Sequence, residues 1–211
     1  MDKKALRELG LYTQFMTEIK DRSVAINRLL DEIRPNKPTI VAGYAQVESA
    51  ILQVRYICEL IALAALAAHS QLGLSGRLLK SWNADETFAR LAHLNRNCFP
   101  RAVKITRPAG GLHIDMLKGR LDMPELQRIY SSCGTLLHRG VMKHALDTGG
   151  GRQYSVDEVV GWMARISSLL RHHIVMLLEP GNVLIVTMNA LGIEVDVAIA
   201  QADGPSLLVE P

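Results

Sequence analysis

The side chains with the greatest chemical potential lie in one short stretch, CGTLLHRGVMKH, which runs from Cys133 to His144. A histidine titrates near neutral pH and serves as a general acid or base, and a guanidinium stabilises the negative charge of a phosphate. We therefore take Arg139, His144 and His138 as candidate catalytic residues.

The spacing of these residues argues against metal binding and against a thiol nucleophile. His138 and His144 are six residues apart, which places them about 120° from each other around a helix, whereas chelating pairs lie at i and i+4. Cys133 and His138 are separated by about 140° on the same helix. The chain also lacks the phosphate-loop, dinucleotide, zinc-protease and serine-hydrolase motifs. We predict no metal site and no cofactor.

A second polar set interrupts the apolar stretch from Thr39 to Leu72. Glu48, Arg55 and Glu59 lie at i, i+7 and i+11, so they share one narrow stripe of a helix. A buried charge has to be paired, and His138 or Arg139 on a neighbouring helix is a candidate partner. Two interpretations remain open: a structural network that fixes packing, or a working site. His138 has the same two interpretations, as a core histidine bound to a carboxylate such as Glu59 or as a functional group.

The pair Arg139-x4-His144 resembles the R-x(4–6)-H motif of HEPN domains. That family consists of bundles of about four helices, often dimeric, and many members are metal-independent ribonucleases while others have lost catalysis. The resemblance implies a site at a dimer cleft, with Arg139 stabilising phosphate charge and His144 acting as the general acid or base. The block YSSCGTLLHRG also resembles bacterial proteins of unassigned function.

The elements that must position these residues are mostly helical. Apolar residues at 3-4 spacing and capping residues predict helices at 2–34, 39–72, 84–96, 123–146 and 156–178. Asn83, Asp122 and Ser155 are the expected N-terminal caps of the last three. His172 and His173 then lie near the C-terminus of the last helix, where the helix dipole favours basic groups.

Two regions have the pattern of strands. Residues 101–116 form two alternating runs around a Pro/Gly turn, which predicts a β-hairpin or an extended loop. Residues 183–188 and 193–201 are β-rich and are joined by the turn at 189–192. We expect a mainly α fold: an antiparallel bundle of about four long helices with a small C-terminal β-hairpin.

The predicted organisation is one domain spanning 1–211. Within it, the helical bundle covers 1–178 with an insertion at 101–116, the hairpin covers 182–201, and 202–211 is a tail. The 211 residues, 48% hydrophobic content and net charge of +3 are typical of a soluble globular protein. Three cysteines without CxxC spacing and the absence of a signal peptide favour the cytoplasm.

The expected partners follow from the same patterns. The long apolar seam of 2–34 suits packing against another helix, in this chain or in a second copy, so we predict a homodimer. Glu48, Arg55 and Glu59 argue against a membrane span, since the uninterrupted apolar run from Leu60 to Ala68 is too short. Two functions are compatible with the sequence: a HEPN-like protein that binds or cleaves RNA, or a non-catalytic protein whose polar seam fixes packing or dimerisation with a protein partner.

Overall fold

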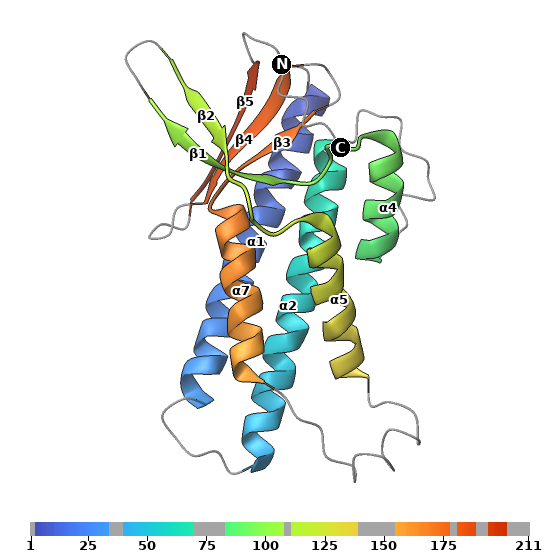
Figure 1. Ribbon diagram of the computed structural model, residues 1–211, viewed down its shortest axis with the longest axis vertical. Coiled ribbons are helices and arrows are strands. Elements are labelled where there is room, and N and C mark those ends of the chain that lie inside the picture. The colour runs from blue at the N-terminus through green and yellow to red at the C-terminus, as the bar shows by residue number, and fades with distance from the viewer. Residues whose placement is uncertain are drawn as a thin grey trace.

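The computed structural model describes residues 3–33, 40–69, 83–107, 111–138, 155–177, 181–188 and 194–201. Two long helices, α1 (Lys3–Ile33) and α2 (Ile40–Ala68), lie side by side along the long axis of the molecule (Figure 1). The 3-4 spacing of α1 places Met16, Ile19 and Ile26 against α2, where each is at most 2% exposed. Both predicted helices are confirmed.

Helix α2 is the central helix of the core. Ile57 and Ile61 lie on one face of it, Cys58 and Ala62 are turned from them by about 100°, and all four are at most 1% exposed. By length and composition the segment Ala45–Ala68 could cross a membrane, which the sequence argument about its shorter apolar run did not anticipate. In this fold 67% of its most apolar window is buried inside the protein, as expected for a core helix.

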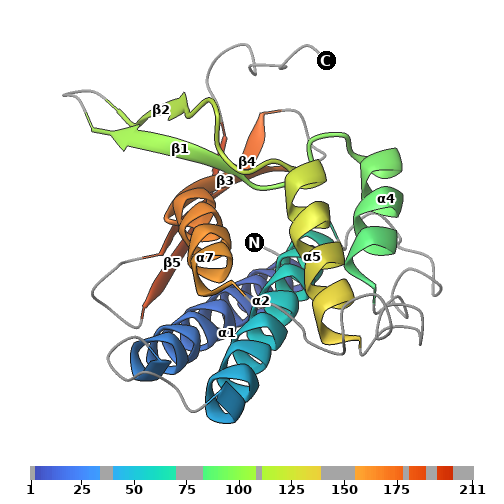
Figure 2. The ribbon, with the colours of Figure 1, turned by 60° about the horizontal axis from the view of Figure 1, so that its bottom comes forward.

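Three shorter helices follow: α4 (Ala84–Leu94), α5 (Met123–Leu137) and α7 (Val156–Leu170). Their starts are confirmed at the predicted caps. Asn83 Oδ1 accepts the backbone N–H of Asp85 at 2.9 Å, and Ser155 Oγ accepts that of Glu158 at 3.2 Å. Asp122 caps α5 through a reciprocal capping box, accepting a backbone N–H at 2.8 Å. Figure 2 shows α5 and α4 on one side of α2 and α7 on the other.

The predicted ends of the last two helices are wrong. Helix α5 ends at Leu137, because His138 has extended backbone angles of φ −75° and ψ 128°. Helix α7 ends at Leu170, and the chain enters a strand at His172 instead of continuing to residue 178. The run His172–Met176 is apolar and β-branched in its centre, and its backbone hydrogen bonds go to neighbouring strands rather than along a helix.

The five strands of the described chain form one antiparallel sheet in the order β2-β1-β3-β4-β5. Their bounds are β1 Arg101–Thr106, β2 His113–Met116, β3 His172–Met176, β4 Asn182–Met188 and β5 Val195–Gln201. The predicted C-terminal hairpin is confirmed as β4–β5, and of the two alternatives at 101–116 the structure has the hairpin, β1–β2. Strand β3 pairs with β1 on one side and with β4 on the other, and so joins the two hairpins.

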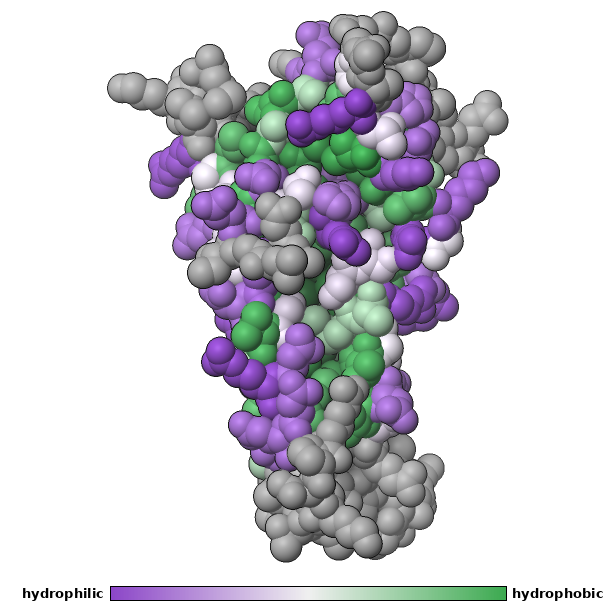
Figure 3. All heavy atoms as spheres, turned by 90° about the vertical axis from the view of Figure 1, so that its left-hand side faces the viewer, coloured by the Kyte–Doolittle hydropathy of each residue, from purple (hydrophilic) through white to green (hydrophobic). Residues whose placement is uncertain are grey.

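The fold is therefore α+β, and the expected mainly α bundle with a small hairpin appendage is wrong. The chain is not an all-α protein, because the region predicted as the end of the last helix forms β3, the middle strand of the sheet. On the face shown in Figure 3, hydrophobic residues gather at the level of the sheet, and hydrophilic ones predominate lower down, at the level of the helices.

The inner face of the sheet closes the core. Val175, Leu184 and Val186 are at most 3% exposed on this face. His173, predicted at a helix end, instead points into it and is 0% exposed. Its Nδ1 lies 2.9 Å from the Leu170 carbonyl oxygen, which can only accept, so Nδ1 carries the proton. Nε2 then accepts the Tyr12 hydroxyl at 2.8 Å, which links α1 to β3.

Candidate functional site

The polar stripe of α2 meets α5 in a compact cluster of three side chains, Arg55, Glu59 and Tyr130. Arg55 Nη2 donates to the Tyr130 hydroxyl at 2.6 Å, and that hydroxyl donates to Glu59 Oε1 at 3.1 Å. Arg55 Nε lies 3.4 Å from the same carboxylate oxygen, and the guanidinium carbon lies 4.0 Å from the centre of the Tyr130 ring. The residue that α5 contributes to the described cluster is Tyr130; the predicted partner His138 is not part of it, and Arg139 lies outside the described residues.

The electrostatics of this cluster suit a structural role. The pKa of Tyr130 is raised to about 12, chiefly by burial and also by the Glu59 carboxylate, against the opposing charge of the Arg55 guanidinium. The phenol thus stays protonated and remains a donor to Glu59. Arg55 and Glu59 are only 21% and 23% exposed, and each has its charge partner. A half-buried ion pair joined by one hydroxyl orients two helices without needing a substrate.

Gly134 allows the guanidinium to approach α5 closely. It lies one turn after Tyr130, and a Cβ at this position would be 2.8 Å from Arg55 Nη1. The close approach of the guanidinium gives a packing reason for glycine at this position, inside a helix where alanine is normally preferred.

The cysteines beside the cluster are not candidate nucleophiles. Cys58 and Cys133 are both 0% exposed. Burial raises the pKa of Cys133 to about 12 against the opposing Arg55 charge, and burial also raises the pKa of Cys58. With pKa values raised in this way, both remain neutral thiols at neutral pH. The nucleophilic form of cysteine is the thiolate, so neither residue is a candidate nucleophile.

Glu48 does not belong to this cluster. It lies seven residues before Arg55, about 10 Å along the helix axis, and it is exposed to solvent. The predicted stripe is thus divided: its C-terminal half contacts α5, and its N-terminal residue lies at the surface.

His138 lies at the C-terminal cap of α5 and is exposed. Its backbone N–H donates to the Gly134 carbonyl at 3.0 Å, while its ring lies at the surface and not in the core. The interpretation of His138 as a core histidine bound to Glu59 is therefore wrong. Arg139 and His144, the other two catalytic candidates, lie outside the residues that the structure describes.

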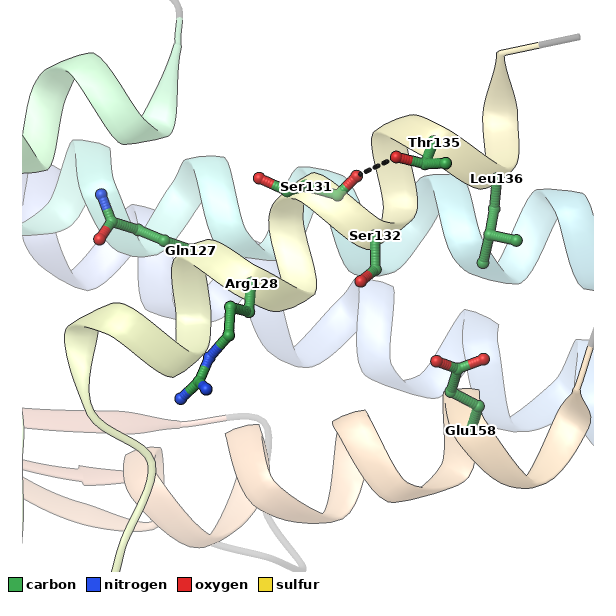
Figure 4. A pocket seen from close by; sticks show the side chains of 7 residues that line it. All are labelled: Gln127, Arg128, Ser131, Ser132, Thr135, Leu136 and Glu158. Carbon is green, nitrogen blue, oxygen red and sulfur yellow. Dashed lines mark hydrogen bonds between the residues drawn. The ribbon is translucent and has the colours of Figure 1, made fainter. Parts of the chain in front are cut away.

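An open groove of about 570 Å³ runs between α5 and α7 and reaches the last turn before His138. Its lining residues are Gln127, Arg128, Ser131, Ser132, Thr135, Leu136 and Glu158. Figure 4 shows Arg128, Ser132 and Leu136 extending from α5 toward α7, and Glu158 extending from α7 toward α5. The hydroxyl, amide and guanidinium groups can bind a polar ligand by hydrogen bonds, and Glu158 adds one carboxylate to the lining.

Sequence reasoning missed Tyr130, Gly134 and this groove. One usable signal was present for Tyr130, since a tyrosine on the apolar side of a helix needs a partner for its hydroxyl. The groove had no such signal, because it depends on the separation of two helices. Within the described ranges, no three His, Cys, Asp or Glu side chains lie close enough together to hold a metal ion.

Comparison with known proteins adds no relative to this description. No protein-family model, no curated protein and no solved structure matches the chain.

Proposed function

We propose that this protein binds RNA and acts on it at the C-terminal end of α5, where His138 meets the α5–α7 groove. The observation that carries the proposal is the exposure of His138. The Glu59 carboxylate, which the sequence suggested as a partner of this histidine, is bound instead by Tyr130 and Arg55. An exposed imidazole beside a polar groove is available to a ligand, whereas a buried and paired one is not.

The chemistry of the proposed ligand follows from the residues of the groove and from the motif at 138–144. Arg128, on the rim of the groove, has a side chain 74% exposed, and a guanidinium binds phosphate oxygens in a fork. Arg139 follows His138 directly in the chain, and His144 completes the motif that resembles HEPN domains. In this proposal Arg139 stabilises phosphate charge, and His144 or His138 transfers the proton during cleavage. A cytoplasmic homodimer remains part of the proposal.

A second candidate function has its own support. The half-buried Arg55–Tyr130–Glu59 cluster has its charges paired, and it fixes the orientation of α2 relative to α5. A protein that relies on such clusters can serve as a non-catalytic interaction partner, with the motif at 138–144 holding no substrate.

The decisive experiment is incubation of the purified protein with several RNAs in the presence of a chelator. His138→Ala, Arg139→Ala and His144→Ala are compared with His93→Ala, which removes an exposed histidine from α4. Loss of a general acid or base lowers the rate by about 10²–10⁴-fold, so the motif variants should lose cleavage and the control should retain it.

The other outcomes contradict parts of the proposal. Binding without cleavage by the parent protein would eliminate catalysis and leave RNA binding. No binding to any RNA at low salt would eliminate the proposal and leave the interaction protein. Circular dichroism of each variant establishes that the fold is unchanged.

A further inference from the structure

We infer that a second cleft, between β1 and the C-terminal end of α7, binds phosphate groups of the RNA backbone. Four basic residues define this basic cleft: Lys104, Arg120, Arg171 and His172. The inference takes its ligand from the proposed function, but it concerns a different set of residues. Nothing in the α5–α7 groove or at His138 contributes to it.

The geometry of the basic cleft is set by three parts of the fold. Lys104 comes from β1, Arg120 from the segment before α5, and the pair Arg171–His172 from the junction of α7 and β3. The cleft has a volume of about 610 Å³, which is enough for a phosphate and its sugar neighbours. Its described lining residues include no carboxylate, so the positive charges there meet no opposite charge within the lining.

Two of the four basic side chains, those of Arg120 and His172, have hydrogen-bond partners, and the backbone of Arg171 is fixed at the end of α7. The Arg120 guanidinium donates to the Ser168 hydroxyl, which orients it across the cleft. His172 Nδ1 lies 3.4 Å from the Thr187 hydroxyl oxygen on β4. The backbone N–H of Arg171 donates to the Ser167 carbonyl at 3.0 Å and so caps α7. Cations that are already oriented lose less entropy when they bind an anion.

Acidic groups on the neighbouring elements have side-chain partners of their own. Asp115, directly across from Lys104 in the β1–β2 register, lies 3.0 Å from His113 Nε2. Glu125, at the start of α5, is paired with Arg165 on α7, and its pKa is lowered chiefly by that hydrogen bond. The cleft therefore keeps a positive potential, which attracts a polyanion.

The basic cleft and the groove beside His138 lie along the same helix. Ser168 lines the cleft and Glu158 lines the groove, and these residues are ten positions apart, about 15 Å along α7. Arg165 lies between them with its side chain 49% exposed. A single strand whose phosphates occupy the cleft could therefore extend along α7 toward His138.

The test measures binding of a fluorescent oligouridylate of about 12 nucleotides, within the usual range of single-strand sites. Lys104→Gln combined with Arg171→Gln is compared with Arg28→Gln combined with Arg96→Gln, which removes the same charge at exposed positions outside both grooves. The association constant K falls as the salt concentration rises, and each lost phosphate contact makes the slope of log K against log salt less steep by about 0.7. The Lys104→Gln/Arg171→Gln variant (the cleft pair) should bind RNA about tenfold more weakly than the parent near 0.1 M salt, with a slope less steep by about 1.4. The Arg28→Gln/Arg96→Gln variant (the control pair) should match the parent.

Each other outcome is informative. If the parent binds RNA and the cleft pair binds it equally well, the inference fails and the proposed function stands. If the control pair loses as much affinity as the cleft pair, binding is a general charge effect and the inference fails. If the parent binds no RNA, both fail. If the Arg171 change perturbs folding, Lys104→Glu is used alone, because Lys104 lies at an exposed strand position away from the α7 cap. It should also weaken RNA binding, and unchanged binding would contradict the inference.

Discussion

Replacing Gly134 by alanine tests whether the Arg55–Tyr130–Glu59 cluster holds α2 against α5. Gly134 and Gly161 are interior residues of two 15-residue helices, α5 and α7. Alanine in place of a helical glycine normally stabilises by about 1 kcal/mol. At Gly161 no heavy atom lies within 4 Å of the added Cβ, whereas at Gly134 the Cβ would lie 2.8 Å from Arg55 Nη1.

The expected magnitude follows from what the guanidinium would lose. Moving Arg55 weakens its 2.6 Å hydrogen bond to Tyr130, a contribution of about 1.5–3 kcal/mol for a charged donor. It also disturbs the cation–π contact, which contributes about 0.5–1 kcal/mol. Because Arg55 is 21% exposed, water replaces part of this loss, and we expect a cost of about 1–2 kcal/mol. Gly134→Ala should therefore be neutral or destabilising by about 1 kcal/mol.

The assay is urea unfolding followed by far-ultraviolet circular dichroism. We expect Gly161→Ala to be about 1 kcal/mol more stable than the parent, and Gly134→Ala to be about 1–2 kcal/mol less stable than Gly161→Ala. With Arg55→Ala already present, Gly134→Ala should recover the ordinary stabilisation of about 1 kcal/mol. Equal stabilisation by the two alanines in the parent chain would refute the reasoning.

Two further predictions concern buried titratable groups. Burial lowers the pKa of His173 to about 4 from its ordinary value of 6.5, so the unfolded chain binds the extra proton between these values. Its contribution to stability is thus complete above about pH 6.5 and decreases as the pH falls toward 4, with a loss of about 2 kcal/mol between pH 7 and pH 5. Urea unfolding should show this loss in the parent and a smaller one in His173→Gln; an equal loss in both would contradict it. Buried Cys58 and Cys133 should react with a thiol reagent only at the rate of unfolding, and rapid labelling in the native state would contradict their placement.

The starts of the helices could be predicted because their determinants are local. Asn83, Asp122 and Ser155 each bond a backbone N–H two or three residues further along the chain. The two hairpins were also predictable, since a turn and the alternation beside it lie within one short stretch. Such signals need no knowledge of the rest of the fold.

Strand β3 could not be predicted in this way. His172–Met176 follows a helix directly, and its apolar residues are compatible with one further helical turn. Its conformation is decided by backbone bonds to β1, about 70 residues earlier, and to β4. One misassigned strand was enough to turn an α+β fold into an expected helical bundle.

The candidate site also has features that local sequence determines and features that depend on tertiary packing. The sequence by itself determined that Arg55 and Glu59 share a helix face, because i and i+4 are neighbours on any helix, and the structure shows that they pair with each other. Only the tertiary structure decided that Tyr130 completes the pair, that His138 is left exposed, and that Lys104, Arg120 and Arg171 converge on one cleft. Helical periodicity fixes the direction of a side chain within its own element, but the partner it meets depends on how distant elements pack.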